Sequence, residues 1–310
     1  MRPYLRRFQE AAERTVGRAT GPVFGDIVRE LFCFGFKQLA SCLFAGSFLA
    51  LLVVSSHIRI PGVLRYDFLF LGAVAIQLLL VLFRLESWRD VGVLSLFHLL
   101  GVGLELFKTA PSIHSWSYPE PAVFKLGSVP LYSGFMYAAV ASYMIQAWRI
   151  FNLRLEGFPR SWQAIALCAL VYANFFANHY LPDQRWLLGL CVLILFRRSH
   201  VHFTVIRIER RMPLALSFLL IGFFIWIAEN IATFFGAWVY PHQIRGWAIV
   251  GTAKISSWTL LVIISFVIVA VLQRKGMRFR GAAITEPSEK GVILSSAYNR
   301  VVVPDRGGPV

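Results

Sequence analysis

Long apolar stretches separated by short polar segments run along most of the chain. They lie near residues 38–57, 67–84, 91–108, 130–149, 162–179, 186–206, 213–236 and 247–272. A helix needs about 20 apolar residues to cross the hydrocarbon layer of a membrane. The pattern therefore predicts an all-α, polytopic bundle of about eight transmembrane helices. Arg197 and Arg198 interrupt the sixth stretch, so we expect that helix to be short or tilted.

Both ends of the chain are polar. Residues 1–37 are rich in arginine, with apolar side chains at helical spacing, and this predicts a basic amphipathic arm on the inner membrane surface. A solvated tail is the alternative for roughly the first twenty residues. No cleavable signal peptide is evident there. Residues 274–310 predict a flexible cytoplasmic tail, because apolar runs there are too short to span.

The composition agrees with a membrane protein. Of the 310 residues 57% are hydrophobic and 15% are charged, whereas a soluble domain carries about 25% charged residues. The net charge is +15, but the basic residues lie between the apolar runs and at the two ends. That placement indicates contact with membrane lipids and disfavours nucleic acid as a partner.

The distribution of basic residues also predicts an orientation. If the N-terminus is cytoplasmic, 21 Lys and Arg side chains between Arg2 and Arg280 lie on the inner side and six on the outer side. The six are Arg59, Arg65, Lys108, Lys125, Arg185 and Arg245. The asymmetry follows the positive-inside rule. We therefore expect an inner-membrane, multi-pass protein with both termini in the cytoplasm, which requires an even number of helices.

An internal repeat divides the chain. Glu105 and Thr109 are followed by Trp116-Ser-Tyr-Pro, and the same pattern recurs as Glu229 and Thr233 followed by Trp238-Val-Tyr-Pro. Four predicted helices separate the two copies, so both have the same orientation in the membrane. This predicts a first four-helix repeat over 38–149 and a second over 150–273.

The candidate catalytic residues are Glu105, Glu229, Lys254 and His98. Ionisable groups inside a membrane helix are costly and usually have a partner or a function. Glu229 lies nine residues before Trp238, and Lys254 lies seven after Trp247. Those spacings put the two charges at similar depths, roughly 13 Å and 10 Å below the outer interface. They predict an ion pair, and Thr109 and Thr233 are expected to bond near their carboxylates.

Aromatic and amide side chains are the candidates for substrate binding. They are Trp116, Tyr118, Tyr132, Asn230, Trp238 and Tyr240, with Tyr132 in the repeat position of Lys254. The aromatic residues either anchor the helix ends in the headgroup layer or form a wall over the two glutamates. Asn174, Asn178 and His179 are further candidates for polar lining. The four cysteines and the histidines show no disulfide or metal-site spacing, so we expect no metal and no cofactor.

Four strings resemble the YoaT-like family of bacterial integral membrane proteins. They are WSYPE (116–120), PLYSGFMYA (130–138), ENIATFFGAWVYP (229–241) and KISSW (254–258). The resemblance covers roughly residues 30 to 275 and excludes the two polar ends. It implies a membrane location and brings no activity, substrate or cofactor.

Three functions remain open. The first is a membrane-embedded enzyme acting on an isoprenoid or other lipid, because acids and aromatic rings at one depth can protonate a double bond and stabilise a carbocation. The second is a proton-coupled transporter of a small molecule, because repeats with ionisable residues between them occur in transporters. The third is a non-catalytic scaffold whose polar residues hold the two halves together. A cavity beside the glutamates would favour the enzyme, and matched helix breaks would favour the transporter.

Overall fold

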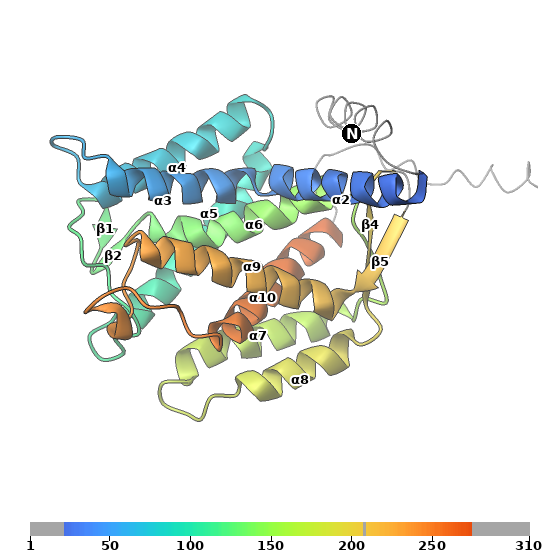
Figure 1. Ribbon diagram of the computed structural model, residues 1–310. Coiled ribbons are helices and arrows are strands. Elements are labelled where there is room, and N and C mark those ends of the chain that lie inside the picture. Colours follow the sequence, from blue (N-terminus) through green and yellow to red (C-terminus); the bar gives the residue numbers. More distant parts are fainter. Residues whose placement is uncertain (1–21, 207–208, 275–310) are drawn as a thin grey trace, which may run out of the picture.

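The computed structural model describes residues 22–206 and 209–274, and its helices lie side by side (Figure 1). In chain order they are α2 (Pro22–Ser41), α3 (Leu43–His57), α4 (Arg65–Leu82), α5 (Trp88–Lys108), α6 (Ser133–Ile150), α7 (Ser161–Ala177), α8 (Arg185–Phe196), α9 (Leu214–Phe234) and α10 (Lys254–Arg274). A short 3-10 helix, η1 (Pro241–Gln243), precedes α10. The protein is mostly helical, as the apolar pattern predicts.

The membrane character is clear from length and composition. Among the described helices, α4, α5, α9 and α10 are long and apolar enough to cross a membrane. Helices α2 and α3 are bent by 71° at their junction, and they form a fifth span if the two are counted as one. Large apolar side chains remain exposed on these elements, including Leu82 at 72%, Leu99 at 68% and Phe224 at 66%. Such surfaces suit lipid rather than water.

The predicted helix bounds need two corrections. The sixth predicted helix, 186–206, ends at Phe196, and its last residues form strand β4 instead. At 12 residues α8 is roughly 18 Å long, which is shorter than the hydrocarbon layer. The last predicted helix, 247–272, begins only at Lys254, because residues 247–253 form a loop. By length and composition alone, the described helices include four or five candidate spans, and eight transmembrane helices stay a prediction.

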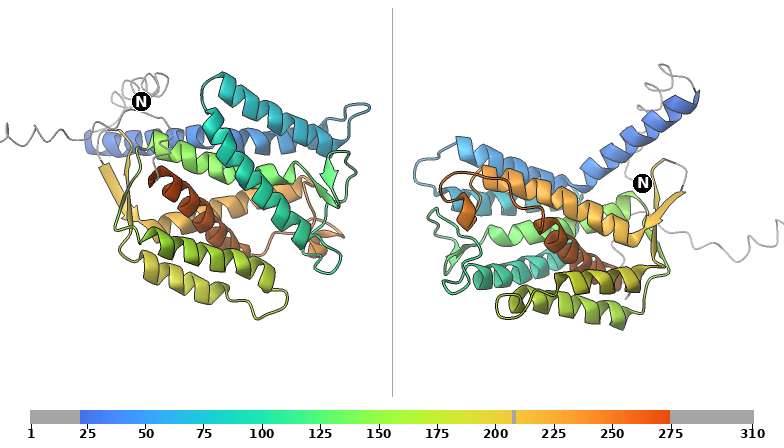
Figure 2. Two further views of the ribbon diagram at one scale, coloured as in Figure 1. Left: turned by 180° about the vertical axis from the view of Figure 1, so that it is seen from behind. Right: turned by 60° about the horizontal axis from the view of Figure 1, so that its bottom comes forward.

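Small sheets mark the two ends of the helical body. Strands β1 (Lys125–Leu126) and β2 (Val129–Pro130) form a hairpin at one end. Strands β3 (Arg154–Glu156), β4 (His200–Thr204) and β5 (Glu209–Pro213) form an antiparallel sheet in the order β3-β4-β5. Figures 1 and 2 show the hairpin and this sheet at opposite ends. The end that carries the hairpin also holds the segments with the two Trp-x-Tyr-Pro motifs.

Two helices form the centre of the body. Helix α6 packs against α5, α2 and α3, and α10 packs against α9, α7 and α6. The start of α5 is fixed by a capping box in which the Ser87 hydroxyl accepts from the Asp90 amide at 3.3 Å. Asp90 also forms a buried ion pair with Arg149 of α6 at 2.5 Å. These contacts set α5 against α6 and so position Glu105 near the other end of α5.

Glycines allow the closest helix approaches. A Cβ atom on Gly101 of α5 would lie 2.4 Å from the Tyr137 ring of α6. A Cβ atom on Gly222 of α9 would lie 2.5 Å from the Thr259 hydroxyl of α10 and 2.8 Å from its backbone nitrogen. Both helix pairs therefore depend on a glycine at the crossing, as is common between membrane helices.

The predicted terminal segments lie largely outside the described residues. Residues 1–21 of the predicted arm and 275–310 of the predicted tail are not described. Residues 22–37 of that arm belong to α2. This helix exposes Ile27, Leu31 and Leu39 and buries Cys33 and Lys37. The basic amphipathic arm on the inner membrane surface stays a prediction.

Candidate functional site

The two Trp-x-Tyr-Pro motifs meet in space. Ser117 and Val239, the middle residues of the motifs, pair in an antiparallel bridge. Each backbone amide donates to the other residue's carbonyl at 2.9 Å. The ring of Trp116 lies edge-on to that of Tyr240, with 6.0 Å between the centroids. The sequence identified both motifs but gave no sign that they bond to each other.

Glu105 of α5 is buried, with 2% of its surface exposed. Its Oε2 accepts hydrogen bonds from the Trp116 indole at 2.7 Å and from the Tyr118 hydroxyl at 2.8 Å. Its Oε1 accepts from the Tyr137 hydroxyl of α6 at 2.8 Å. Three aromatic donors thus take the place of water around this carboxylate, and such bonds are strongest when the acceptor is ionised.

Glu229 of α9 has a similar environment and is 3% exposed. Its Oε1 accepts from the Tyr240 hydroxyl at 2.6 Å. Its Oε2 accepts from the Trp258 indole of α10 at 2.8 Å. In each case one donor comes from the motif that follows the glutamate and another from the next helix. The motifs therefore hold the carboxylates directly, and do more than anchor helix ends.

Lys254, the first residue of α10, lies over aromatic rings. Its Nζ is 5.1 Å from the centroid of Trp116 and 4.6 Å from that of Tyr240. Such contacts contribute about 1–2 kcal/mol when partly desolvated. In the described part of the chain Lys254 makes no direct contact with Glu229, so the predicted ion pair is not formed, and aromatic donors bond to both carboxylate oxygens instead.

The phenols around the carboxylates act as donors. Burial, and then the charge of Glu105, raise the pKa of Tyr118 well above its usual range. Burial and Glu229 do the same for the pKa of Tyr240. Both hydroxyls therefore keep their protons at any physiological pH, and their bonds to the glutamates persist.

A cavity of about 360 Å³ opens beside these groups. Its charged lining consists of Glu105, Lys108, Arg185, Glu229 and Lys254. Its aromatic lining includes Trp116, Tyr137, Trp238, Tyr240 and Trp258, and Leu104, Met136, Phe175 and Leu261 add apolar surface. A pocket of this size accommodates a small organic molecule.

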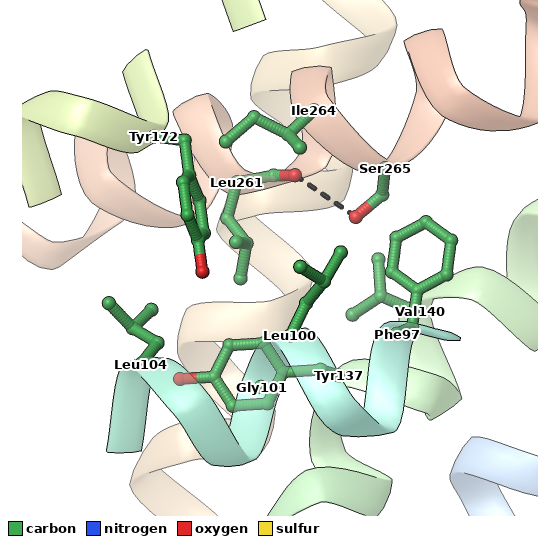
Figure 3. A pocket seen from close by; sticks show the side chains of 10 residues that line it. All are labelled: Phe97, Leu100, Gly101, Leu104, Tyr137, Val140, Tyr172, Leu261, Ile264 and Ser265. Carbon is green, nitrogen blue, oxygen red and sulfur yellow. Dashed lines mark hydrogen bonds between the residues drawn. The ribbon is translucent and has the colours of Figure 1, made fainter. Parts of the chain in front are cut away.

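A second, smaller cavity of about 20 Å³ lies deeper between α5, α6, α7 and α10 (Figure 3). It is almost wholly apolar, and it shares Leu104, Tyr137 and Leu261 with the larger one. Figure 3 shows the Tyr137 ring beside Gly101, with its hydroxyl directed toward the Leu104 end of α5. Tyr137 therefore lies between a charged cavity and an apolar one.

Not all predicted residues reach the larger cavity. His98 packs against Phe135, with 4.6 Å between ring centroids, and its buried Nδ1 has no hydrogen-bond partner among the described residues. Tyr132 is fully buried, and its hydroxyl donates to the Ala237 carbonyl. Asn230 accepts from the Val250 amide at 2.8 Å. These three contribute to packing and to the position of the 235–253 loop.

Thr109 and Thr233 were expected to bond near the two carboxylates, but their hydroxyls bond to backbone carbonyls. The Thr109 hydroxyl bonds to the backbone carbonyl of Glu105 at 2.9 Å, and that of Thr233 bonds to the Asn230 carbonyl at 3.1 Å. A threonine hydroxyl readily bonds back to its own helix. Neither reaches a carboxylate, because the aromatic donors already surround it.

Several lining residues were not among the candidates. Tyr137 and Trp258 occur within the strings PLYSGFMYA and KISSW, but nothing in the sequence assigned them to a carboxylate. Lys108 bonds to Asn178 Oδ1 at 3.2 Å and to His179 Nε2 at 2.7 Å. Asn178 and His179 thus line the cavity as predicted, whereas Asn174 bonds to the Gln184 amide instead. Within the described residues, no cluster of His, Cys, Asp and Glu is arranged to hold a metal ion.

Comparisons with known proteins agree with the resemblance seen in the sequence. The model of the family described as Protein of unknown function (DUF817) matches residues 30–266. The chain belongs to this family. It is 49% identical over 247 residues to Uncharacterized protein YoaT of Bacillus subtilis (strain 168). The aligned residues make up 80% of this chain and 93% of that protein. No solved structure matches the chain. The matched range includes the whole candidate site, from Glu105 to Trp258.

Proposed function

We propose that this protein is a membrane-embedded enzyme that acts on an isoprenoid or other lipid. The observation that supports this best is the cavity of about 360 Å³ in which two buried carboxylates, one ammonium group and several aromatic rings meet. A protein that only held its helices together would not need a cavity at this point. The candidate catalytic residues are Glu105, Glu229 and Lys254.

The charges and rings suggest a division of roles. The carboxylates are held by aromatic donors and are suited to stabilise positive charge on a bound molecule. The aromatic rings of the cavity that Lys254 does not cover, such as Trp238, can do the same by cation–π contact. A protonated glutamate can donate the proton to a double bond, and Lys254 adds an ammonium group that is not bonded to either carboxylate. Acid and base groups in one cavity are the minimum that proton transfer to or from a lipid requires.

We further propose that the chain is built from two four-helix copies, α3–α6 and α7–α10. The matching surroundings of Glu105 and Glu229 support this, as do the glycine crossings at Gly101 and Gly222. In this proposal all eight helices lie in the cell membrane and both termini are cytoplasmic. The short helices α3, α7 and α8, of 15, 17 and 12 residues, would then rely on local thinning of the bilayer.

Transport of a small molecule is the alternative. A transporter of this type is expected to have broken helices at corresponding places in both copies. Among the described helices one bent pair is found, between α2 and α3, and it has no counterpart near α7. A non-catalytic scaffold is less well supported, because the Lys254 ammonium is left facing a cavity rather than paired.

Lipid profiling of a deletion strain tests the enzyme. We expect an apolar precursor to accumulate in the deletion strain and to return to its normal level when the wild-type gene is restored. Glu105→Gln and Glu229→Gln should not restore it, because each removes a charge from the cavity. Glu86→Gln is a matched control, since Glu86 is also buried and accepts from Ser142 and Gln77, but it lies outside this cavity.

Two results would contradict the enzyme. An unchanged lipid profile in the deletion strain together with altered uptake or efflux of a solute would favour transport. If Glu105→Gln and Glu229→Gln both restored the normal lipid profile, the two carboxylates would not take part in the reaction. Membrane abundance of each variant, measured by immunoblotting, separates loss of function from loss of protein.

A further inference from the structure

The hydrogen-bond donors in the larger cavity are not balanced by free acceptors. All four carboxylate oxygens of Glu105 and Glu229 already accept from Trp or Tyr side chains. Each carboxylate offers about four acceptor positions, and these five bonds leave only a minority of them for a cationic group on a ligand. Such a ligand would also meet Lys254 on the ring faces of Trp116 and Tyr240, where a ligand cation would otherwise bind. The cavity is therefore poorly suited to a cationic headgroup.

Lys254 is the clearest unmatched donor. Among the described residues its Nζ makes ring contacts but no hydrogen bond or ion pair. An ammonium group has three N–H donors and no acceptor. Leaving such donors without acceptors in a partly buried place is costly. A bound ligand with acceptor oxygens would satisfy them.

Two more cations line the same cavity. Lys108 uses two acceptors, Asn178 and His179, and so has one N–H left. Arg185 forms an ion pair with Asp183 through Nε, and its Nη1 donates to the Ala253 carbonyl at 3.4 Å. Its Nη2 makes no hydrogen bond among the described residues. The three side chains come from α5, α8 and α10 and supply donors from three directions.

We infer that the ligand is an amphiphile with a phosphate-type oxyanion headgroup, held by Lys254, Lys108 and Arg185. A phosphate offers several acceptor oxygens around one centre, which suits donors that converge from separate helices better than one planar carboxylate does. The inference deepens the proposed function by naming the substrate class, and it rests on that function only in taking the ligand to be a substrate.

The shared lining of the two cavities indicates where the apolar part of the ligand would lie. Leu104, Tyr137 and Leu261 line both the charged cavity and the small apolar one. A hydrocarbon chain attached to the headgroup lies along these residues beside the Tyr137 ring and within the larger cavity, because the small one holds only a water-sized group. The reacting carbons then lie beside the aromatic rings and carboxylates, with the headgroup at the cations.

A binding experiment with the full chain in maltoside detergent tests the inference. The probes are farnesyl phosphate, farnesol and inorganic phosphate, with tryptophan fluorescence as the readout because Trp116 and Trp258 line the cavity. Farnesyl phosphate should bind roughly tenfold tighter than farnesol or inorganic phosphate, since only it uses both parts of the cavity. Equal binding of farnesol would overturn the oxyanion headgroup, and equal binding of inorganic phosphate would overturn the amphiphile.

Lysine variants locate the site. Lys254→Met should weaken farnesyl phosphate binding by roughly tenfold or more and leave farnesol binding unchanged. Lys125→Met, the same change at an exposed lysine of β1, should bind as the wild type does. If Lys254→Met does not fold, as judged by size-exclusion chromatography, Lys108→Met carries the test. If the lysine variant that folds bound farnesyl phosphate as tightly as the wild type does, the assignment of the headgroup to these lysines would be wrong.

The outcome is separable from that of the proposed function. Binding is measured without turnover, so tight and Lys254-dependent binding supports the headgroup even if the lipid profile does not change. Conversely, a deletion strain that accumulates a lipid without an anionic group would support the enzyme and overturn this inference.

Discussion

Aromatic hydroxyl and indole groups, rather than basic side chains, surround the two buried carboxylates of the larger cavity. Glu105 has three such donors and Glu229 has two. This arrangement keeps the negative charges inside a helical body while the lysines remain available. It also explains why charge pairing was a poor guide at this site. The depth of Glu229 and Lys254 was predicted from spacing, but the competition from Tyr240 and Trp258 depends on three-dimensional contacts.

Tyr137→Phe should destabilise the protein by about 1–3 kcal/mol. It removes one of three donors to a buried carboxylate, and hydrogen bonds to charged groups have about this value. The measurement is unfolding of the purified protein in detergent, monitored by circular dichroism. Tyr172→Phe is the control, because Tyr172 also lines the small cavity but its hydroxyl makes no hydrogen bond among the described residues. Equal effects of the two changes would contradict the role given to Tyr137.

Helix crossings show what apolar patterns can and cannot predict. The apolar pattern predicted eight helices, and the structure has a helix, α3 to α10, overlapping each of these eight stretches. It did not distinguish Gly101 from Gly103, which look alike in the sequence. Only Gly101 faces another helix, since a Cβ atom on Gly103 would have nothing within 4 Å. The end of α8 at Phe196 was also missed, because the strand that follows forms by pairing with β3 and β5.

Gly222→Ala should destabilise the α9–α10 contact by about 1–3 kcal/mol, the usual range for overpacking. The added methyl group would meet the Thr259 backbone, which cannot rotate away as a side chain can. Unfolding in detergent measures the effect. Gly103→Ala serves as the control and should be neutral or stabilising by up to about 1 kcal/mol, since alanine favours helix. A neutral result for Gly222→Ala would mean that the two helices are further apart.

The whole molecule has two unlike ends. The β1-β2 hairpin lies at one end and the β3-β4-β5 sheet at the other (Figure 1). The cavity is lined by the last turns of α5, by residues of the two Trp-x-Tyr-Pro motifs and by the start of α10. In the proposed orientation the cavity faces the outer leaflet and the sheet faces the cytoplasm. The charge asymmetry of the sequence predicts this orientation, but the helix lengths alone do not decide how many segments cross the membrane.

Cysteine labelling of intact cells tests the orientation. In a chain whose four native cysteines are replaced by serine, Lys125→Cys should react with a membrane-impermeant maleimide added outside. Arg197→Cys should react only after the cells are opened, because positive charges stay on the cytoplasmic side. Both positions are exposed, so reactivity depends on the side of the membrane. The reverse pattern would invert the orientation, and labelling of both from outside would contradict the proposed topology.

The bridge between Ser117 and Val239 has a consequence for biogenesis. Helices α6, α7, α8 and α9 lie between the two residues in the sequence, and Lys254 follows them. While the ribosome is still making these helices, Glu105 already has Trp116 and Tyr118 close by in the nascent chain, but Glu229 and Lys254 do not yet exist. The binding site is therefore completed last, after insertion of α10. A chain released early carries a buried acid but no cavity for a ligand.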